Sequence, residues 1–91
     1  MLTLIWSPSA FDQLEAISTY IAQFNESAAI ALRHRIEDAV LPALSHPYAF
    51  RAGRIKGTRE IVAHPNYIVV YRVAADHVEV LGVMHSHQEY P

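Results

Sequence analysis

The 91-residue sequence contains no cysteine. This absence excludes a disulfide framework, a thiol nucleophile and a cysteine-ligated zinc site, and it fits the reducing cytoplasm in which we expect the chain to reside. The sequence also lacks an apolar run approaching the roughly 20 residues that span a bilayer. Residues 1–6 lack the basic start and the long apolar stretch of a signal peptide. We therefore expect no membrane association.

Charged residues are also few, at 18% of the chain, whereas hydrophobic residues make up 52%. This balance is typical of a folded globular protein and excludes an intrinsically disordered chain. The length allows one domain, which we place over residues 1–91, and leaves little room for a second. The net charge of −2 gives the whole chain no general attraction for nucleic acid.

The few cationic side chains are concentrated in one segment. Five of the seven lie between residues 51 and 72, where Glu60 is the only acidic residue: Arg51, Arg54, Lys56, Arg59 and Arg72. This window carries a charge of +4 and the remainder −6. Such a segment can attract phosphate or an acidic partner, or it can be a solvated face. Arg59 and Arg72 can instead pair with Glu60 or Glu79, and exposed pairs of that kind add little stability.

The beginning of the sequence predicts a strand followed by a helix. β-Branched and aromatic residues at 2–6 favour a strand. Ser7 and Pro8 then supply the cap and the first-turn proline of a helix. Apolar residues recur every three or four positions, which predicts one apolar helical face formed by Phe11, Leu14, Ile17, Ile21 and Phe24.

A second helix is predicted after a short interruption. Asn25 or Ser27 can cap it, and it should end or kink before Pro42. Its inward face is expected to carry Ala29, Leu32, Ile36 and Val40. Because the connection is only a few residues long, the two helices should form an antiparallel hairpin. A loop is expected from residue 46 to residue 57, and it holds much of the cationic segment.

The rest of the sequence changes to the pattern of strands. Strands are predicted at 59–63, 68–73 and 78–84, with turns at 64–67 and 74–77 between them. The strand at 68–73 is the most apolar, so we expect it to be central. The predicted fold class is α+β, a single domain with an N-terminal strand, an α-helical hairpin and a three-stranded antiparallel meander. One sheet covered on one face by the hairpin would bury one core.

Several runs together resemble one family. They are Gly57-Thr58-Arg59-Glu60-Ile61-Val62, His64-Pro65-Asn66-Tyr67, Val69-Val70-Tyr71-Arg72-Val73 and Val83-Met84-His85-Ser86-His87. With the opening strand, the Ser-Pro-Ser-Ala helix start and Leu41-Pro42, they make the chain similar to RelE/ParE-superfamily toxins of type II toxin–antitoxin systems. The resemblance is closest to the ParE-like branch and covers nearly the whole chain.

This resemblance implies a toxin neutralised by a cognate antitoxin in a hetero-oligomeric complex. RelE-like relatives bind the ribosome and cut messenger RNA, whereas several ParE-like relatives poison DNA gyrase. Where the nucleases carry an arginine after the tyrosine of the central strand, this chain has Ile68, and their lysine-rich strand is replaced by Glu60-Ile61-Val62-Ala63. His87 stands near the place of a terminal arginine. These departures favour a toxin that acts by binding a large target such as gyrase.

The residues predicted to bind the target are Arg51, Arg54, Lys56, Arg59, His85 and His87. In the alternative, a ribosome-dependent endoribonuclease, His85 or His87 would be the base and Tyr90 the acid. Arg54, Lys56 and Arg59 would then contact phosphate. A third interpretation is a degenerate relative that only binds its antitoxin.

Other ring-bearing side chains have structural interpretations. His64 is a turn residue in the simplest reading, and Tyr67 and Tyr71 are aromatics that pack on the sheet. Tyr48 and Phe50 can pin the loop to the core, while Trp6 and Tyr20 suit either internal packing or a partner. His85 and His87 can bind metal as a pair, but no third ligand is evident, so we predict no metal site and no cofactor.

The antitoxin is expected to bind as a helix, with a strand as a possible addition, along the helical hairpin and the sheet edge. Acidic residues on the helices and the cationic loop would offer it two oppositely charged surfaces. The acidic residues are Asp12, Glu15, Glu37 and Asp38.

Overall fold

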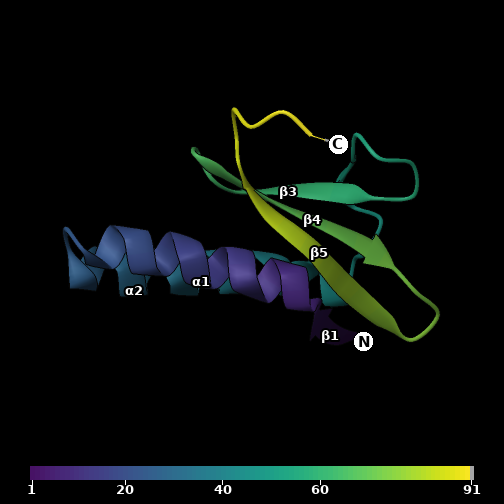
Figure 1. Cartoon of the computed structure of the whole chain (residues 1–91). Coiled ribbons are helices and arrows are strands. Elements are labelled where there is room, and N and C mark those ends of the chain that lie inside the picture. The colour runs from purple at the N-terminus through teal and green to yellow at the C-terminus, as the bar shows by residue number, and fades with distance from the viewer. Residues whose placement is uncertain (91) are drawn as a thin grey trace.

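The structure is a computed structural model that describes residues 1–90, so residue 91 of the expected domain lies outside it. Two helices cover one face of a five-stranded sheet, as Figure 1 shows. The elements are β1 (Thr3–Trp6), α1 (Pro8–Ala22), α2 (Glu26–Val40), the 3₁₀ turn η1 (Leu41–Leu44), β2 (Arg51–Ala52), β3 (Arg59–His64), β4 (Tyr67–Val73) and β5 (His77–His85). The predicted α+β architecture, with its helical hairpin and meander, is confirmed.

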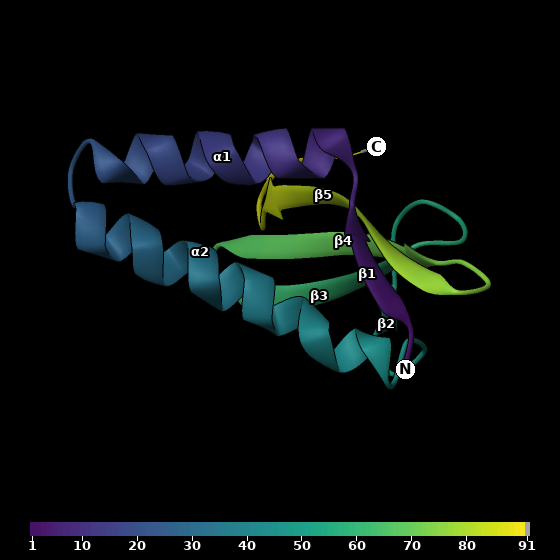
Figure 2. The ribbon, with the colours of Figure 1, turned by 90° about the horizontal axis from the view of Figure 1, so that it is seen from below.

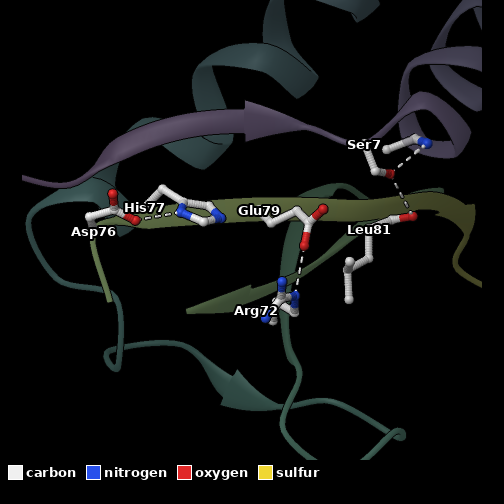
Figure 3. A network of polar contacts seen from close by, with 7 residues as sticks. Ser7, Arg72, Asp76, His77, Glu79 and Leu81 are labelled. Carbon is white, nitrogen blue, oxygen red and sulfur yellow. Dashed lines mark hydrogen bonds and ion pairs between the residues drawn. The ribbon is translucent and has the colours of Figure 1, made fainter. Parts of the chain in front are cut away.

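The strands are ordered β1-β5-β4-β3-β2, so the apolar strand β4 is central, as predicted. β1 pairs in parallel with β5, with Thr3 opposite His77, and the other pairings are antiparallel. Ser7 locks the end of β1 to β5, since its N–H donates to the Val80 carbonyl (3.0 Å) and its hydroxyl to the Leu81 carbonyl (3.4 Å; Figure 3). The sheet therefore joins strands from both ends of the chain.

Side-chain caps set where the helices begin. The Ser7 hydroxyl accepts a hydrogen bond from the Ala10 N–H at 3.1 Å, and Pro8 occupies the first turn of α1. Asn25, rather than Ser27, caps α2, because its side-chain oxygen accepts from the Ala28 N–H at 3.0 Å. Each cap satisfies a backbone donor that has no partner within its helix. The end of α2 at Val40, ahead of Pro42, is also confirmed.

The main core lies between the helical hairpin and the sheet. Its strand residues include Ile61, Val69, Tyr71, Val78 and Val80. From α2, Ala29, Ile36 and Val40 are buried and Leu32 is partly buried, so the predicted inward face of that helix is confirmed. No helix among residues 1–90 has the length and apolarity needed to cross a membrane.

The predicted apolar face of α1 is wrong at both ends. Phe11 is 48% exposed and Phe24 is 74% exposed, and the helix ends at Ala22. Ala10 and Leu14 are the buried residues of α1. Phe24 lies in the turn between α1 and α2, and Figure 2 shows that this turn extends beyond the ends of the strands, where no sheet covers it. Periodicity identifies an apolar stripe but not the length of helix that the sheet can cover.

The prediction of an uninterrupted loop at 46–57 is also wrong. Two of its residues, Arg51 and Ala52, form β2 and pair with Glu60 and Arg59 of β3. A strand of two residues is too short to show an alternating pattern, which is why sequence periodicity misses it. Gly57 (φ 84°) makes the turn between β2 and β3 in a backbone conformation that favours glycine.

Candidate functional site

Two arginines of the predicted target-binding set converge on a buried carboxylate. Glu60 is 5% exposed. The Arg51 guanidinium approaches Oε1 of Glu60 to 3.0 Å, and Arg54 Nε lies 3.9 Å from Oε2. Because a buried charge is costly unless it is paired, these arginines compensate Glu60. Part of the positive charge of these arginines is therefore neutralised by Glu60 and is not available to a partner in solvent.

The other arginines of the cationic segment also have internal partners. Arg59 does not pair with Glu60; it donates to the carbonyls of Phe50 (2.7 Å) and Tyr48 (3.3 Å). Its guanidinium also lies 5.0 Å from the centre of the Tyr48 ring. The predicted pairing of Arg72 with Glu79 is confirmed at 2.6 Å (Figure 3).

Lys56 differs from these arginines. It is exposed and has no ion pair within the described part of the chain. Within residues 51–72, all of which the structure describes, the arginines contact other parts of the chain, whereas the Lys56 ammonium has no ion-pair partner. Sequence reasoning counted charges, whereas three-dimensional pairing decides how many of them face solvent.

Three histidines and a tyrosine form a row at one end of the sheet. The ring centres are 5.8 Å apart for His64 and Tyr67, 5.5 Å for Tyr67 and His85, and 5.5 Å for His85 and His87. His64 is the last residue of β3 rather than part of the turn that was predicted for it, and its Nδ1 accepts the Asn66 N–H of the following turn at 3.0 Å. His85 and His87 are exposed, which leaves both imidazoles accessible to a partner or substrate.

Tyr90 lies apart from this row, on the helix-free face. It is 8% exposed and packs with Ile68, Val70 and Met84. The Arg54 guanidinium lies 4.4 Å from the centre of its ring. Its hydroxyl is buried and has no hydrogen-bond partner among residues 1–90, so it is not presented to a substrate. Sequence reasoning placed Tyr90 beside the histidines and missed its packing role.

A groove that sequence reasoning missed runs between α1 and β5. Its volume is about 380 Å³, and its lining includes Ala16, Ile17, Tyr20, Tyr67, Val83 and His85. The Gln13 side chain reaches from α1 to β5, and its oxygen accepts a hydrogen bond from the Val83 N–H at 2.8 Å. β1 pairs with β5 only as far as Val80, so Gln13 satisfies a backbone donor at an open strand edge.

Exposed aromatic side chains continue this surface at the tip of the hairpin. Tyr20 is 61% exposed and Phe24 is 74% exposed, and their rings pack edge to face with centres 5.4 Å apart. Tyr20 therefore belongs to the surface, whereas Trp6 packs partly against the core. Phe50 contacts the core through Tyr71, but Tyr48 is 67% exposed and does not pin the loop.

Tyr71 and Asp76 have shifted pKa values. Burial raises the pKa of the Tyr71 hydroxyl above its usual value, and Arg59 opposes this shift. A hydrogen bond from His77 lowers the pKa of the exposed Asp76 carboxyl (Figure 3). Within residues 1–90, no group of three or more His, Cys, Asp or Glu side chains is placed to hold a metal ion.

Comparisons with known proteins agree along almost the whole chain. The model of a family described as "ParE toxin of type II toxin-antitoxin system, parDE" matches residues 4–90. "Putative toxin Y4kP" of Sinorhizobium fredii is 42% identical over 87 residues, covering 94% of this chain and 90% of that protein. "Toxin RelE2" of Caulobacter vibrioides is 31% identical over 88 residues, covering 94% and 97%. A solved structure described as "Chromosomal ParDE TA system from P. aeruginosa" has a TM-score of 0.81 at 21% identity, covering 93% and 96%.

Proposed function

This chain belongs to the ParE toxin family of type II toxin–antitoxin systems, and we propose that it acts by binding a large cytoplasmic target, with DNA gyrase the first candidate. Family membership implies an antitoxin partner. Mechanism within the superfamily divides between binding and RNA cleavage. For this chain, we decide between binding and RNA cleavage from the side chains that its sheet would present to an RNA substrate.

The observation that carries the proposal is the environment of Ile68. The resemblance assigns the catalytic arginine of the nucleases to this position, but here the side chain is 2% exposed and packs under Tyr90. On the neighbouring strand, Glu60 lies opposite Val70 where the nucleases have a residue of the lysine-rich strand, and its charge is compensated by Arg51. An apolar cluster and a carboxylate give little stabilisation to a phosphorane-like transition state, since that state requires cations. This arrangement supports a binding mode of action.

The cationic loop and the exposed histidines are the proposed target-binding surface. Lys56 is its free cation, and His85 and His87 supply exposed rings with hydrogen-bonding nitrogens. Arg51, Arg54 and Arg59 are the other cations of this surface, and each makes internal contacts while part of its side chain stays exposed.

Gyrase inhibition by the purified chain tests this proposal. We expect the chain to inhibit DNA supercoiling and its expression to induce the DNA-damage response before translation falls. Lys56→Glu should weaken inhibition at least several-fold, because it reverses an exposed charge without breaking an internal pair. Asp12→Lys, an exposed charge reversal on α1, is the matched control and should inhibit like the wild type. An early, selective loss of translation without a DNA-damage response would contradict the proposal.

We further propose that the antitoxin covers the groove between α1 and β5 and the aromatic tip of the hairpin. The exposed rings of Tyr20 and Phe24 and the open edge near Val83 are features that a helix or an added strand can bury. Amide hydrogen exchange with and without the antitoxin tests this. Protection should increase at residues 81–85 and along α1, whereas protection confined to the β2–β3 loop would contradict the assignment.

A ribosome-dependent endoribonuclease is the second candidate. The exposed imidazoles of His85 and His87, with centres 5.5 Å apart, favour it because histidine exchanges protons near neutral pH. Tyr90 would have to leave its buried position to act as the acid. Full toxicity of the double variant His85→Ala with His87→Ala would exclude this mechanism, whereas cuts in messenger RNA at the ribosomal A site would establish it.

A further inference from the structure

The last described residues cross the helix-free face of the sheet, and we call residues 86–90 the C-terminal strap. Ser86 N–H donates to the Asn66 carbonyl (2.7 Å), and Gln88 N–H donates to the His85 carbonyl (2.9 Å). This turn redirects the chain after β5, and Figure 1 shows the segment on the side of the sheet away from the helices. The strap ends with the Tyr90 ring packed on the sheet.

Arg54 fastens the strap. Its Nη1 donates to the Gln88 carbonyl at 3.0 Å, and its guanidinium lies 4.4 Å from the centre of the Tyr90 ring. The same side chain approaches Glu60 to 3.9 Å. One arginine from the loop between β2 and β3 thus bridges the strap and the sheet. The contacts with the strap involve a neutral carbonyl and a ring, so a carboxylate would be a stronger partner for this guanidinium.

The strap leaves buried polar groups without partners. Three buried side-chain oxygens have no hydrogen-bond partner within residues 1–90: Oε2 of Glu60, Oγ of Ser86 and Oη of Tyr90. Two belong to the strap, and the third belongs to the carboxylate that Arg54 also contacts. A buried donor or acceptor without a partner destabilises the state that buries it. Closing the strap is therefore favoured by the apolar contacts of Tyr90, and it is opposed by the free-energy cost of burying polar groups that lack hydrogen-bond partners.

Beneath the strap lies an apolar surface next to the Arg54 guanidinium. Ile68 and Val70 form its floor, with Met84 beside them. Val62 is the cross-strand partner of Ile68 and is 59% exposed, so it extends the apolar surface beyond the strap. The apolar floor and the Arg54 guanidinium together define the chemistry of a ligand that can bind here.

We propose that this helix-free face is a docking site for a partner peptide segment carrying an aromatic side chain and a nearby carboxylate, and that Tyr90 occupies the site in the free chain. The aromatic ring of the partner replaces Tyr90 on Ile68 and Val70. Its carboxylate replaces the Gln88 carbonyl on Arg54. The proposed site shares Arg54 and His87 with the target-binding surface, and Gln88 of the strap also lines the groove between α1 and β5. Its test uses peptide binding to the purified chain and needs neither gyrase nor the antitoxin.

Displacement of the strap has a measurable thermodynamic consequence. A ligand for a site that is mostly closed binds with an apparent affinity reduced by the open fraction. Opening the strap should therefore strengthen binding, and stabilising the closed strap should weaken it. Two substitutions of the same tyrosine separate these effects. Tyr90→Ala removes the ring that fills the site, while Tyr90→Phe keeps the ring and removes the unpaired hydroxyl.

The test is a titration of the full-length chain with an end-blocked peptide, Ser-His-Glu-Glu-Tyr, followed through the NMR signal of the Met84 methyl group. Tyr90→Ala should bind about tenfold more tightly than the wild type, as expected if the strap is closed roughly nine times in ten. Tyr90→Phe should bind more weakly than the wild type. Tyr48→Ala is the matched control, because it removes another ring that contacts an arginine, and it should bind like the wild type.

A second peptide tests the chemistry of the partner. Ser-His-Gln-Glu-Tyr should bind the Tyr90→Ala chain several-fold more weakly, and Arg54→Gln should abolish the difference between the two peptides. Equal binding to wild-type and Tyr90→Ala chains would overturn the proposal, as would the absence of any shift at Met84. Tightening by Tyr48→Ala or by Tyr90→Phe would also overturn it.

Discussion

The two faces of the sheet are built differently. The face under the helices carries a continuous apolar core, and the Tyr71 hydroxyl, the polar atom within it, donates to the Pro47 carbonyl. The helix-free face carries a smaller apolar cluster, a buried carboxylate and buried oxygens that have no hydrogen-bond partner within the described residues 1–90. Consecutive residues of β4 point to opposite faces, so Val69 belongs to the core under the helices and Val70 to the cluster on the helix-free face. One face thus supplies stability, and the other keeps groups whose bonding a partner can complete.

Matched isoleucines on opposite faces give the largest expected contrast. Ile61 is 4% exposed under the helices, and Ile68 is 2% exposed under the strap. Ile61→Ala should cost about 3–4 kcal/mol because the helix and sheet cannot close the cavity, whereas Ile68→Ala should cost about 2 kcal/mol because the strap can settle. Urea denaturation measures both. Equal losses would mean that the strap is packed as rigidly as the core.

Substitutions of two arginines should give a smaller difference in stability, because one arginine pairs with a buried carboxylate and the other with a more exposed one. Arg51→Ala should cost about 2 kcal/mol, because the buried Glu60 carboxylate loses its nearer cation. Arg72→Ala removes an exposed pair with Glu79 and should cost less than about 1 kcal/mol. Chemical denaturation at pH 7 compares them. If Glu60→Gln rescues the Arg51→Ala loss, the cost arises from the buried charge; no rescue would assign it to packing.

The smallest expected effect concerns pH. Since burial raises the pKa of Tyr71, the unfolded chain ionises at a lower pH than the folded chain. The resulting stability is complete below the ordinary tyrosine value of 10.0 and is lost as the pH rises above it. Tyr71→Phe should cost about 1 kcal/mol at pH 7 through the lost hydrogen bond, and this deficit should shrink above pH 10.

Denaturation at pH 7 and pH 11 provides the measurement, with Tyr48→Phe as the control on an exposed hydroxyl. The control should lose stability at alkaline pH in parallel with the wild type. A Tyr71→Phe chain that lost stability at the same rate would show that another group controls the alkaline limit.

The sequence predicts the fold well because its signals are local. Ser7, Asn25 and Pro42 mark helix ends through hydrogen bonds and covalent geometry within a few residues. The central position of β4 follows from its apolar composition. The exposure of Phe24 could not be predicted, because it depends on how far the hairpin extends past the sheet.

The candidate site is less accessible from sequence because it depends on contacts between distant residues. Arg72 and Glu79 form the pair that was anticipated, seven positions apart in one hairpin. Arg54 meets Gln88 across 34 positions, and no local pattern signals that contact. Gln13 at the edge of β5 is similarly invisible, since its partner Val83 is 70 positions away.

The parallel pairing of β1 with β5 constrains the order in which the molecule can be completed. Ser7 bonds to Leu81, 74 positions later in the chain. During synthesis, β1 must therefore wait for β5, which leaves the ribosome more than 70 residues later. A nascent chain can form its helical hairpin early, but the complete sheet exists only after β5 has been made. A prematurely terminated product would lack the neighbour of its first strand and could not assemble the finished toxin.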